Sequence, residues 1–160
     1  MKKVSILIIV SLLFSCGYSI RKVSELPYRE IEIGTVQNRT FEPDIEDILE
    51  IKLTDELSKQ GFLIKNTAAH RITGTITNFD LKVVSEKDQF SREYEVVIMA
   101  DIVLTGPDGF ELKLINVRSP FIESFTAETD INSIISFKEL ATERALGSFA
   151  NRIVSEVIYK

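Results

Sequence analysis

The sequence of 160 residues contains one cysteine, one histidine and no tryptophan. A single cysteine excludes an internal disulfide bond, even in an oxidising compartment. There are also too few histidines and thiols for a nucleophile–base pair or a zinc-type metal site. His70 comes just before an expected strand, and we interpret it as an exposed strand-end residue. We therefore predict a protein that is not an enzyme and that uses neither a metal nor a dissociable cofactor.

The glycines are few and isolated, so the chain has no glycine-rich loop that could hold a phosphate group. Basic residues are outnumbered by acidic ones, 19 to 24, and the formal net charge is −5. Because phosphate backbones bind to basic surfaces, this balance argues against nucleic acid as a partner. Beyond the N-terminal segment, no apolar run is long enough to cross a bilayer.

The N-terminal segment has the pattern of an export signal. Two lysines precede an apolar run over residues 4–14, which as a helix would reach only about 16 Å, roughly half of a bilayer core. A short apolar run that ends in a small residue and then Cys16 resembles the lipobox of bacterial lipoproteins. By that resemblance, residues 1–15 are removed and Cys16 carries an S-diacylglycerol group and an N-acyl chain. The alternative is an ordinary secretory signal with an incidental cysteine.

The chain from Cys16 onward is long enough for one domain with a hydrophobic core. We expect residues 16–28 to be a polar tether and residues 29–160 to be the domain. Without the two N-terminal lysines, the formal net charge becomes −7. By the sorting pattern of enterobacterial lipoproteins, the glycine that follows Cys16 in place of an aspartate favours the outer membrane.

The most regular stretch, residues 92–121, predicts two long strands joined by a tight turn. Apolar residues occupy the even positions from Val96 to Leu104, which is the period of a pleated strand, and residues 105–109 have turn composition. Eleven residues of the first strand would reach about 36 Å. The scaffold of the domain is therefore expected to be a sheet.

The register of this ribbon depends on the position of its turn. Pairing around residues 107 and 108 would place Arg118 level with Val97. It would also bring Lys113 close to Asp101, and we predict a cross-strand ion pair between these two residues.

The other segments complete an α+β fold. Strands are predicted over 30–36, 62–64 and 71–84, with helices over about 44–60 and from Ser136 onward, and a loop over 123–130. The third strand changes phase near Asn78, which indicates either a β-bulge or partial burial of both faces. We predict a two-layer sandwich, in which two helices pack on a mixed sheet of four to five strands with long antiparallel strands.

Two helices would cover only one face of this sheet. The ribbon carries a second apolar set that points to the other face: Val97, Met99, Val103 and Ile115. An apolar face without a cover predicts a partner protein. The alternative is that a loop or the tether folds over this face.

Four basic residues are expected near one end of the sheet: Lys82, Lys87, Arg92 and Arg118. Such residues could bind the phosphate groups of an amphipathic ligand. Acidic residues are interleaved with them, however, so a solvated loop of mixed charge is the alternative interpretation.

The order and spacing of several motifs resemble the LptE family of outer-membrane lipoproteins, which assemble lipopolysaccharide in Gram-negative bacteria. These motifs are Cys16-Gly17-Tyr18 after the lipobox, Asn38-Arg39-Thr40-Phe41-Glu42-Pro43 before a helix, Arg92-Glu93-Tyr94, Gly106-Pro107-Asp108-Gly109 and Val117-Arg118-Ser119. The resemblance covers essentially the whole chain after Cys16.

The resemblance implies a non-catalytic α/β domain that plugs the β-barrel protein LptD, helps it to assemble and assists lipopolysaccharide transport to the cell surface. It implies a position inside the barrel lumen, with a lipid anchor on the periplasmic side of the outer membrane. It also implies contact with lipopolysaccharide through basic residues at the end of the sheet, Arg118 among them. The alternative is a lipoprotein scaffold of another envelope complex.

Overall fold

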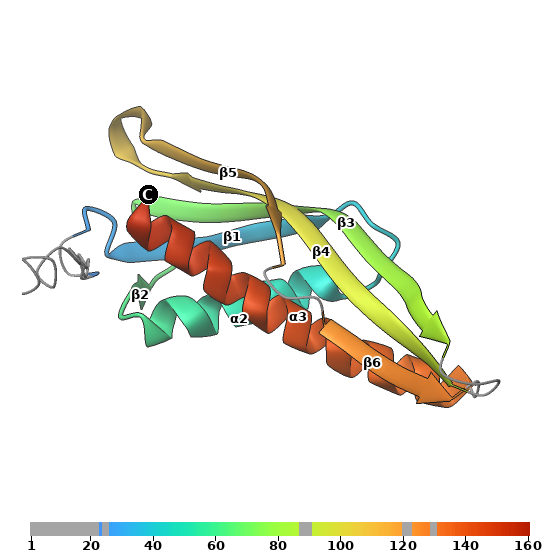
Figure 1. Cartoon of the computed structure of the whole chain (residues 1–160). Helices are drawn as coiled ribbons and strands as arrows, with labels where there is room; N and C mark the ends of the chain where they lie inside the picture. Colours follow the sequence, from blue (N-terminus) through green and yellow to red (C-terminus); the bar gives the residue numbers. More distant parts are fainter. Residues whose placement is uncertain (1–22, 24–25, 87–90, 120–122, 129–130) are drawn as a thin grey trace, which may run out of the picture.

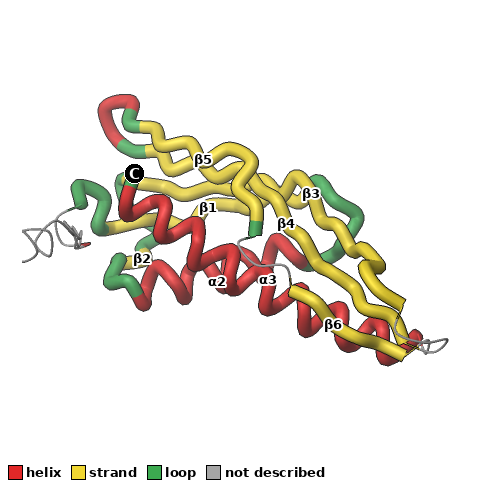
Figure 2. Tube along the Cα trace, viewed as in Figure 1, coloured by secondary structure: helices red, strands yellow, loops and turns green. Residues whose placement is uncertain are grey.

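The computed structural model describes residues 23, 26–86, 91–119, 123–128 and 131–160. These residues form the two predicted layers, a twisted sheet and two helices that pack against one face of it (Figures 1 and 2). The helices are α2 (Ile45–Lys59) and α3 (Ile131–Tyr159). The strands are β1 (Glu30–Asn38), β2 (Leu63–Ile64), β3 (His70–Glu86), β4 (Ser91–Thr105), β5 (Glu111–Arg118) and β6 (Glu123–Glu128). The predicted α+β sandwich is confirmed.

The sheet is mixed, in the order β2-β1-β3-β4-β5, and β6 also pairs with β4. Strand β1 runs parallel to both β2 and β3, and the other pairs are antiparallel. The long strand β4 has β3 along one side, while its other side is shared by β5 and β6. The ribbon predicted over residues 92–121 is formed by β4 and β5, and β3 pairs with β4 along its other side, so these three strands form the centre of the sheet.

The hydrophobic core lies between this ribbon and the helices. The even positions of β4 from Val96 to Leu104 are at most 1% exposed, as the period of two requires. Every fourth residue of α3 from Ala141 to Val157 is buried against them, and Phe149 is fully buried in the middle of this stripe. The small side chains of Ala141 and Ala145 fit the close approach of α3 to α2 and the sheet.

Three register shifts interrupt the pairing of β4 with its neighbours, one of them between Val83 and Ser85 of β3. The register of β3 against β4 shifts between Ile76 and Asn78, which confirms the predicted bulge. A second shift occurs on β5 opposite Asp101, where Asn116 has a positive φ of 54°. This second bulge has no clear sequence signal, because asparagine is only one of several residues that tolerate this conformation.

A difference of one residue at the turn, followed by the second bulge, makes two register predictions wrong. Arg118 lies level with Met99 rather than Val97. The Asp101 carboxylate accepts a hydrogen bond from the backbone N–H of Asn116 at 2.7 Å. Lys113 lies opposite Val103 and pairs instead with Glu111 on its own strand, at 2.8 Å. The predicted ion pair between Asp101 and Lys113 therefore does not form.

The segment before α3 also differs from the prediction. Residues 123–128 form strand β6 rather than a loop, and α3 begins at Ile131, five residues before Ser136. The capping pattern at Ser136 and Glu139 is local, whereas the first turns of α3 lie along β6, and this contact extends the helix (Figure 1).

The end of the expected tether belongs to the domain. Leu26 and Tyr28 are buried in the core, and the Tyr28 hydroxyl donates a hydrogen bond to the Val157 carbonyl at 2.9 Å. The Tyr28 ring also lies 5.8 Å from the ring of His70 and 5.4 Å from that of Phe110. The packed domain therefore begins before residue 29. His70 is half-buried between aromatic rings, so its interpretation as an exposed strand-end residue is wrong.

Candidate ligand and partner surfaces

The four basic residues predicted to bind a ligand lie on different strands. Lys82 is on β3 and Arg118 ends β5, while Lys87 lies outside the described residues. The backbone of Arg92 is on β4, opposite Glu86 and Ala127, and its side chain lies outside the described part. Cys16, the predicted lipidation site, also lies outside it.

Lys82 and Arg118 are both exposed, but their charges are not equally available. The Lys82 ammonium lies 2.9 Å from the Asp80 carboxylate, so its charge is already paired. Arg118 forms no ion pair with any residue that the structure describes. A free guanidinium can bind an anionic group in two-pronged geometry, and Arg118 is therefore the stronger candidate of the two.

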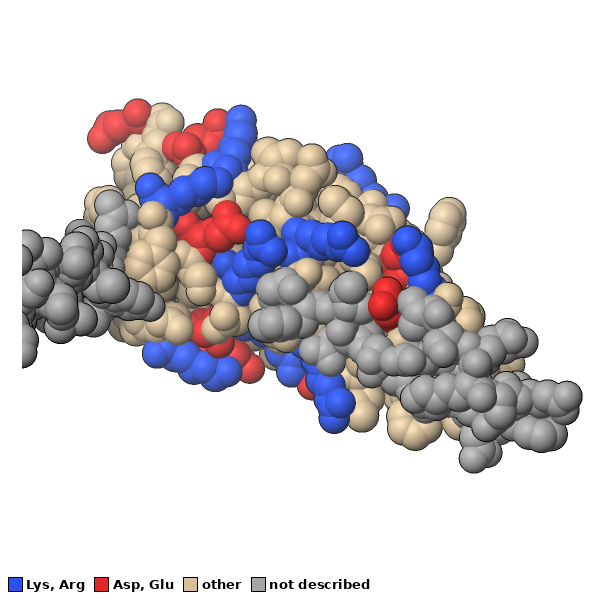
Figure 3. All heavy atoms as spheres, viewed as in Figure 1, with Lys and Arg blue, Asp and Glu red and all other residues tan. Residues whose placement is uncertain are grey.

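These two residues are too far apart to hold the same phosphate group. Lys82 lies opposite Glu95, and Arg118 lies opposite Met99, on the other side of β4. The four-residue step along β4 corresponds to about 13 Å. They could contact separate anionic groups of one large ligand. Figure 3 shows acidic side chains interleaved with basic ones on one face of the molecule, in agreement with the mixed charge of the sequence.

The four residues predicted to face a partner have different exposures. Val97 is only 6% exposed, so it is already covered in the isolated chain. Met99 and Val103 are half-buried on the outer face of β4. Ile115 is 57% exposed on β5. Of this set, Ile115 offers the largest free apolar surface to a partner.

Sequence reasoning missed a second set of exposed apolar residues, which lie in the turn before α2, on α2 and on the first turns of α3. This set comprises Phe41, Ile51, Ile131, Ile135, Phe137 and Leu140. Because α3 was predicted to begin at Ser136, Ile131 and Ile135 were not recognised as helical residues. Their helical spacing within 131–140 was the available signal.

Phe41 is fully exposed at the tip of an ordered turn. The backbone N–H of Thr40 donates to Asn38 Oδ1 at 2.9 Å, and Asn38 Nδ2 donates to Glu46 Oε2 at 2.8 Å. These bonds tie the turn to both β1 and α2, and so hold the Phe41 ring in solvent. A large aromatic residue presented in this way is typical of a binding anchor.

A groove of about 690 Å³ lies between the start of α2 and the first half of α3. Ile45, Ile48 and Leu140 are among its apolar lining residues. An ion pair between Lys52 and Glu143, 2.7 Å apart, crosses it. The Lys52 ammonium holds the pKa of the Glu143 carboxyl below its ordinary value, so protonation of Glu143 breaks this pair only in acid.

Thr142 lines the groove with a hydroxyl that has no hydrogen-bond partner within the described structure, although the residue is only 4% exposed. Thr142→Val is expected to raise the free energy of unfolding by roughly 1 kcal/mol, because it removes an unsatisfied buried polar atom. Urea denaturation measures the change. The matched variant is Thr54→Val on α2, which loses a hydrogen bond to the Glu50 carbonyl (2.8 Å) and should not stabilise. A loss of stability in Thr142→Val would mean that a water molecule or ligand bonds this hydroxyl.

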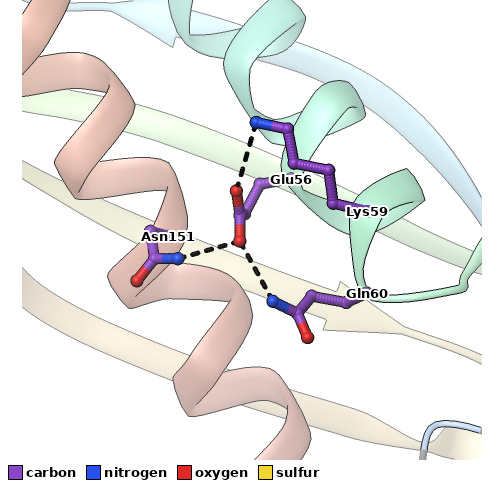
Figure 4. A network of polar contacts seen from close by, with 4 residues as sticks. All are labelled: Glu56, Lys59, Gln60 and Asn151. Carbon is purple, nitrogen blue, oxygen red and sulfur yellow. Dashed lines mark hydrogen bonds and ion pairs between the residues drawn. The ribbon is translucent and has the colours of Figure 1, made fainter.

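Polar contacts join the two helices of the helical layer. Figure 4 shows one of them, in which the Glu56 carboxylate accepts from Asn151 of α3 at 2.8 Å and from Gln60 at 3.1 Å. These contacts hold the C-terminal end of α2 against α3. Among the residues described, no group of three or more His, Cys, Asp or Glu side chains could hold a metal ion. Neither described helix is long and apolar enough to span a membrane.

Comparison with known proteins adds a family match to this geometry. The model of the LptE family, described as lipopolysaccharide-assembly, matches residues 28–157. That range contains all the strands and nearly all of both helices. No curated protein sequence matches the chain significantly.

Three solved structures share the fold. A minor lipoprotein of Acinetobacter baumannii is 12% identical, with a TM-score of 0.50, over 82% of this chain and 92% of that one. A candidate lipoprotein of Caulobacter crescentus is 20% identical, with a TM-score of 0.50, over 77% and 87%. A protein of Xanthomonas campestris is 11% identical, with a TM-score of 0.52, over 78% and 81%. At such identities the likeness concerns the fold alone.

Proposed function

Because this chain belongs to the LptE family of lipopolysaccharide-assembly proteins, we propose that it plugs an LptD-type outer-membrane β-barrel and helps that barrel to assemble. The single observation that carries the proposal is the family match across residues 28–157, the whole of the two-layer domain. In this proposal the domain catalyses no reaction and acts by filling the barrel lumen.

The surface of the domain supports a plug. Neither helix covers the outer face of the sheet, where Ile115 is exposed, and a second exposed apolar set surrounds Phe41 and the start of α3. Exposed apolar residues on both sides of one domain favour a partner that surrounds it over one that touches a single face.

We place the protein at the periplasmic side of the outer membrane, where the lipid on Cys16 anchors it. Removal of residues 1–15 leaves Cys16 at the new N-terminus, with acyl chains that together give stable anchoring. Fewer than ten residues then separate the lipid from Leu26, which is already part of the core. The domain is therefore held close to the membrane that contains the barrel.

Lipopolysaccharide contact is the finer part of the proposal. Its phosphate groups are chemically matched to the guanidinium of Arg118, which no described ion pair neutralises. Arg92 and Lys82 are further candidates toward the end of the β3–β4 pair, and Lys87 lies between them in the sequence; the paired Lys82 is the weakest of the three. Because Arg118 lies level with Met99, in the middle of β4, the ligand would extend along β4 from Arg118 toward this end while the barrel encloses the domain.

Gentle detergent extraction of the tagged full-length chain from its own envelope tests the function. The chain should co-purify with one very large outer-membrane barrel protein, and depletion of that barrel should lower the amount of the chain. The intact mass should correspond to a chain that begins at Cys16 and carries lipid. An unrelated outer-membrane lipoprotein with the same tag is the control. Recovery with soluble periplasmic proteins alone would instead identify a scaffold of another envelope complex.

A further inference from the structure

One edge of the sheet is open along the second half of β3. Strand β1 pairs with β3 only as far as Asn38, opposite Ile76, and the Arg39 N–H donates to the Ile76 carbonyl at 3.0 Å. Beyond this point the chain turns away toward α2. From Asn78 onward β4 is the only described strand that pairs with β3, and Figure 1 shows the other side of β3 without a neighbouring strand.

The backbone groups on this open side can be identified from the ladder on the other side of β4. The Ile98 N–H donates to Ser119 Oγ at 3.3 Å, and the Ile98 carbonyl accepts from the Ser119 N–H at 2.9 Å, so both groups point away from β3. Phe79 lies directly opposite Ile98. In an antiparallel pair of this kind, the backbone groups of both residues point away from each other. The N–H and carbonyl of Phe79 therefore face the open side.

The alternation of the strand extends this result to Leu81 and Val83, which lie opposite Val96 and Tyr94. No described residue pairs with the outward backbone groups of these three residues. Native edges are usually protected by short length, proline, charged side chains or β-bulges. Here register shifts lie on either side of residues 79–83, and the two charged residues between them, Asp80 and Lys82, pair with each other. Within residues 79–83 the edge is thus a row of donors and acceptors that no described residue pairs with.

A hollow of about 390 Å³ lies beside this edge. The half-buried side chains of Phe79 and Leu81 form part of its lining, as do Arg39, Phe41 and the ion pair between Lys138 and Glu42 (2.7 Å). Arg39 forms no ion pair with a described residue, so its charge is available to an acidic group of the occupant. Backbone groups that repeat every second residue, about 6.8 Å, match an extended polypeptide and match neither a sugar nor an acyl chain.

We propose that the edge of β3 from Phe79 to Val83 binds an extended segment of the partner protein, which joins the sheet as an added strand next to β3. The segment places an apolar side chain in the hollow beside Phe79 and Leu81 and an acidic side chain near Arg39. This inference rests on the proposed function, because the segment belongs to the barrel partner.

Hydrogen exchange on the wild-type protein tests the added strand. The amides of Phe79, Leu81 and Val83 should exchange fast in the lipidated chain purified without the barrel, and at least about tenfold more slowly in the purified complex. Exchange that stays fast at all three amides of an intact complex overturns the added strand and leaves the plug intact. Failure to isolate any complex overturns the proposed function itself.

A pair of variants at Val83 gives a second, independent test. Val83→Pro removes one outward N–H, at a residue that is 50% exposed, and leaves the hydrogen bonds to β4 in place. It should weaken binding to the barrel roughly tenfold, as expected for one lost hydrogen bond and a disturbed strand pairing. The matched variant Val83→Thr keeps the N–H and should bind normally. Equal affinity of the two folded variants, checked by thermal unfolding, overturns the proposal.

Discussion

Phe149→Ala is expected to lower the free energy of unfolding by about 3–5 kcal/mol. Phe149 is 0% exposed and is the largest fully buried side chain among the residues that the structure describes. It lies in the middle of the buried stripe of α3, the helix that packs against α2, β4, β5 and β6. Its removal therefore costs the transfer energy of the ring and leaves a cavity that these rigid neighbours cannot close. Because a small domain has only about 5–15 kcal/mol of stability, much of the total is lost.

The same substitution elsewhere on α3 provides the control. Phe137 is 44% exposed, three turns earlier on the helix, and Phe137→Ala should change the stability by no more than about 0.5–1 kcal/mol. Urea denaturation of both variants, followed by circular dichroism, measures the difference. Equal losses in the two variants would mean that the first half of α3 is as tightly packed as its middle.

The sequence predicts well those elements in which the spacing of apolar residues matches the residues that are buried. The alternation of β4 and the four-residue spacing of α3 each reflect contact with one common core, so both appear in the structure as expected. The turn after α2 is a similar case, because Gly61 has the positive φ of 93° that a helix-ending glycine adopts.

The elements that the sequence does not predict depend on contacts between distant segments. Strand β6 has a polar composition, and it forms a strand because it completes the side of β4 that β5 leaves free. The position of Arg118 is a similar case. The turn shifts the predicted register by one residue, and the bulge at Asn116 shifts it by one more. Together they move Arg118 two positions along β4, from Val97 to Met99.

For the candidate sites, too, the sequence predicts the residue types but not the contacts that those residues make with distant segments. The basic residues and the outer apolar set are visible in the sequence, but their availability is not. Only the structure shows that Asp80 neutralises Lys82 and that Val97 is covered. The open edge of β3 is likewise invisible, because it arises from the length of β1 relative to β3 and not from any residue type.

The second large expected effect is a loss of lipopolysaccharide binding when the charge of Arg118, which is unpaired among the described residues, is reversed. Arg118→Glu is expected to weaken binding of purified lipopolysaccharide roughly tenfold to a hundredfold, because a charge-assisted contact becomes a repulsion. The double variant with Arg92→Glu should bind more weakly still. Lys82→Glu should have a smaller effect than Arg118→Glu, since the wild-type charge of Lys82 is already paired with Asp80.

Lys113→Glu is the matched control, because Lys113 lies on the same strand as Arg118 but is paired with Glu111 at 2.8 Å. Lys82, Lys113 and Arg118 are exposed, so the single variants at these positions should not shift the thermal unfolding of the domain appreciably. Binding by surface plasmon resonance at two salt concentrations separates the contributions, because a direct phosphate contact weakens with salt. Unchanged binding by the folded double variant would remove direct lipopolysaccharide contact from the proposal. The plug would then act on lipopolysaccharide only through the barrel that encloses it.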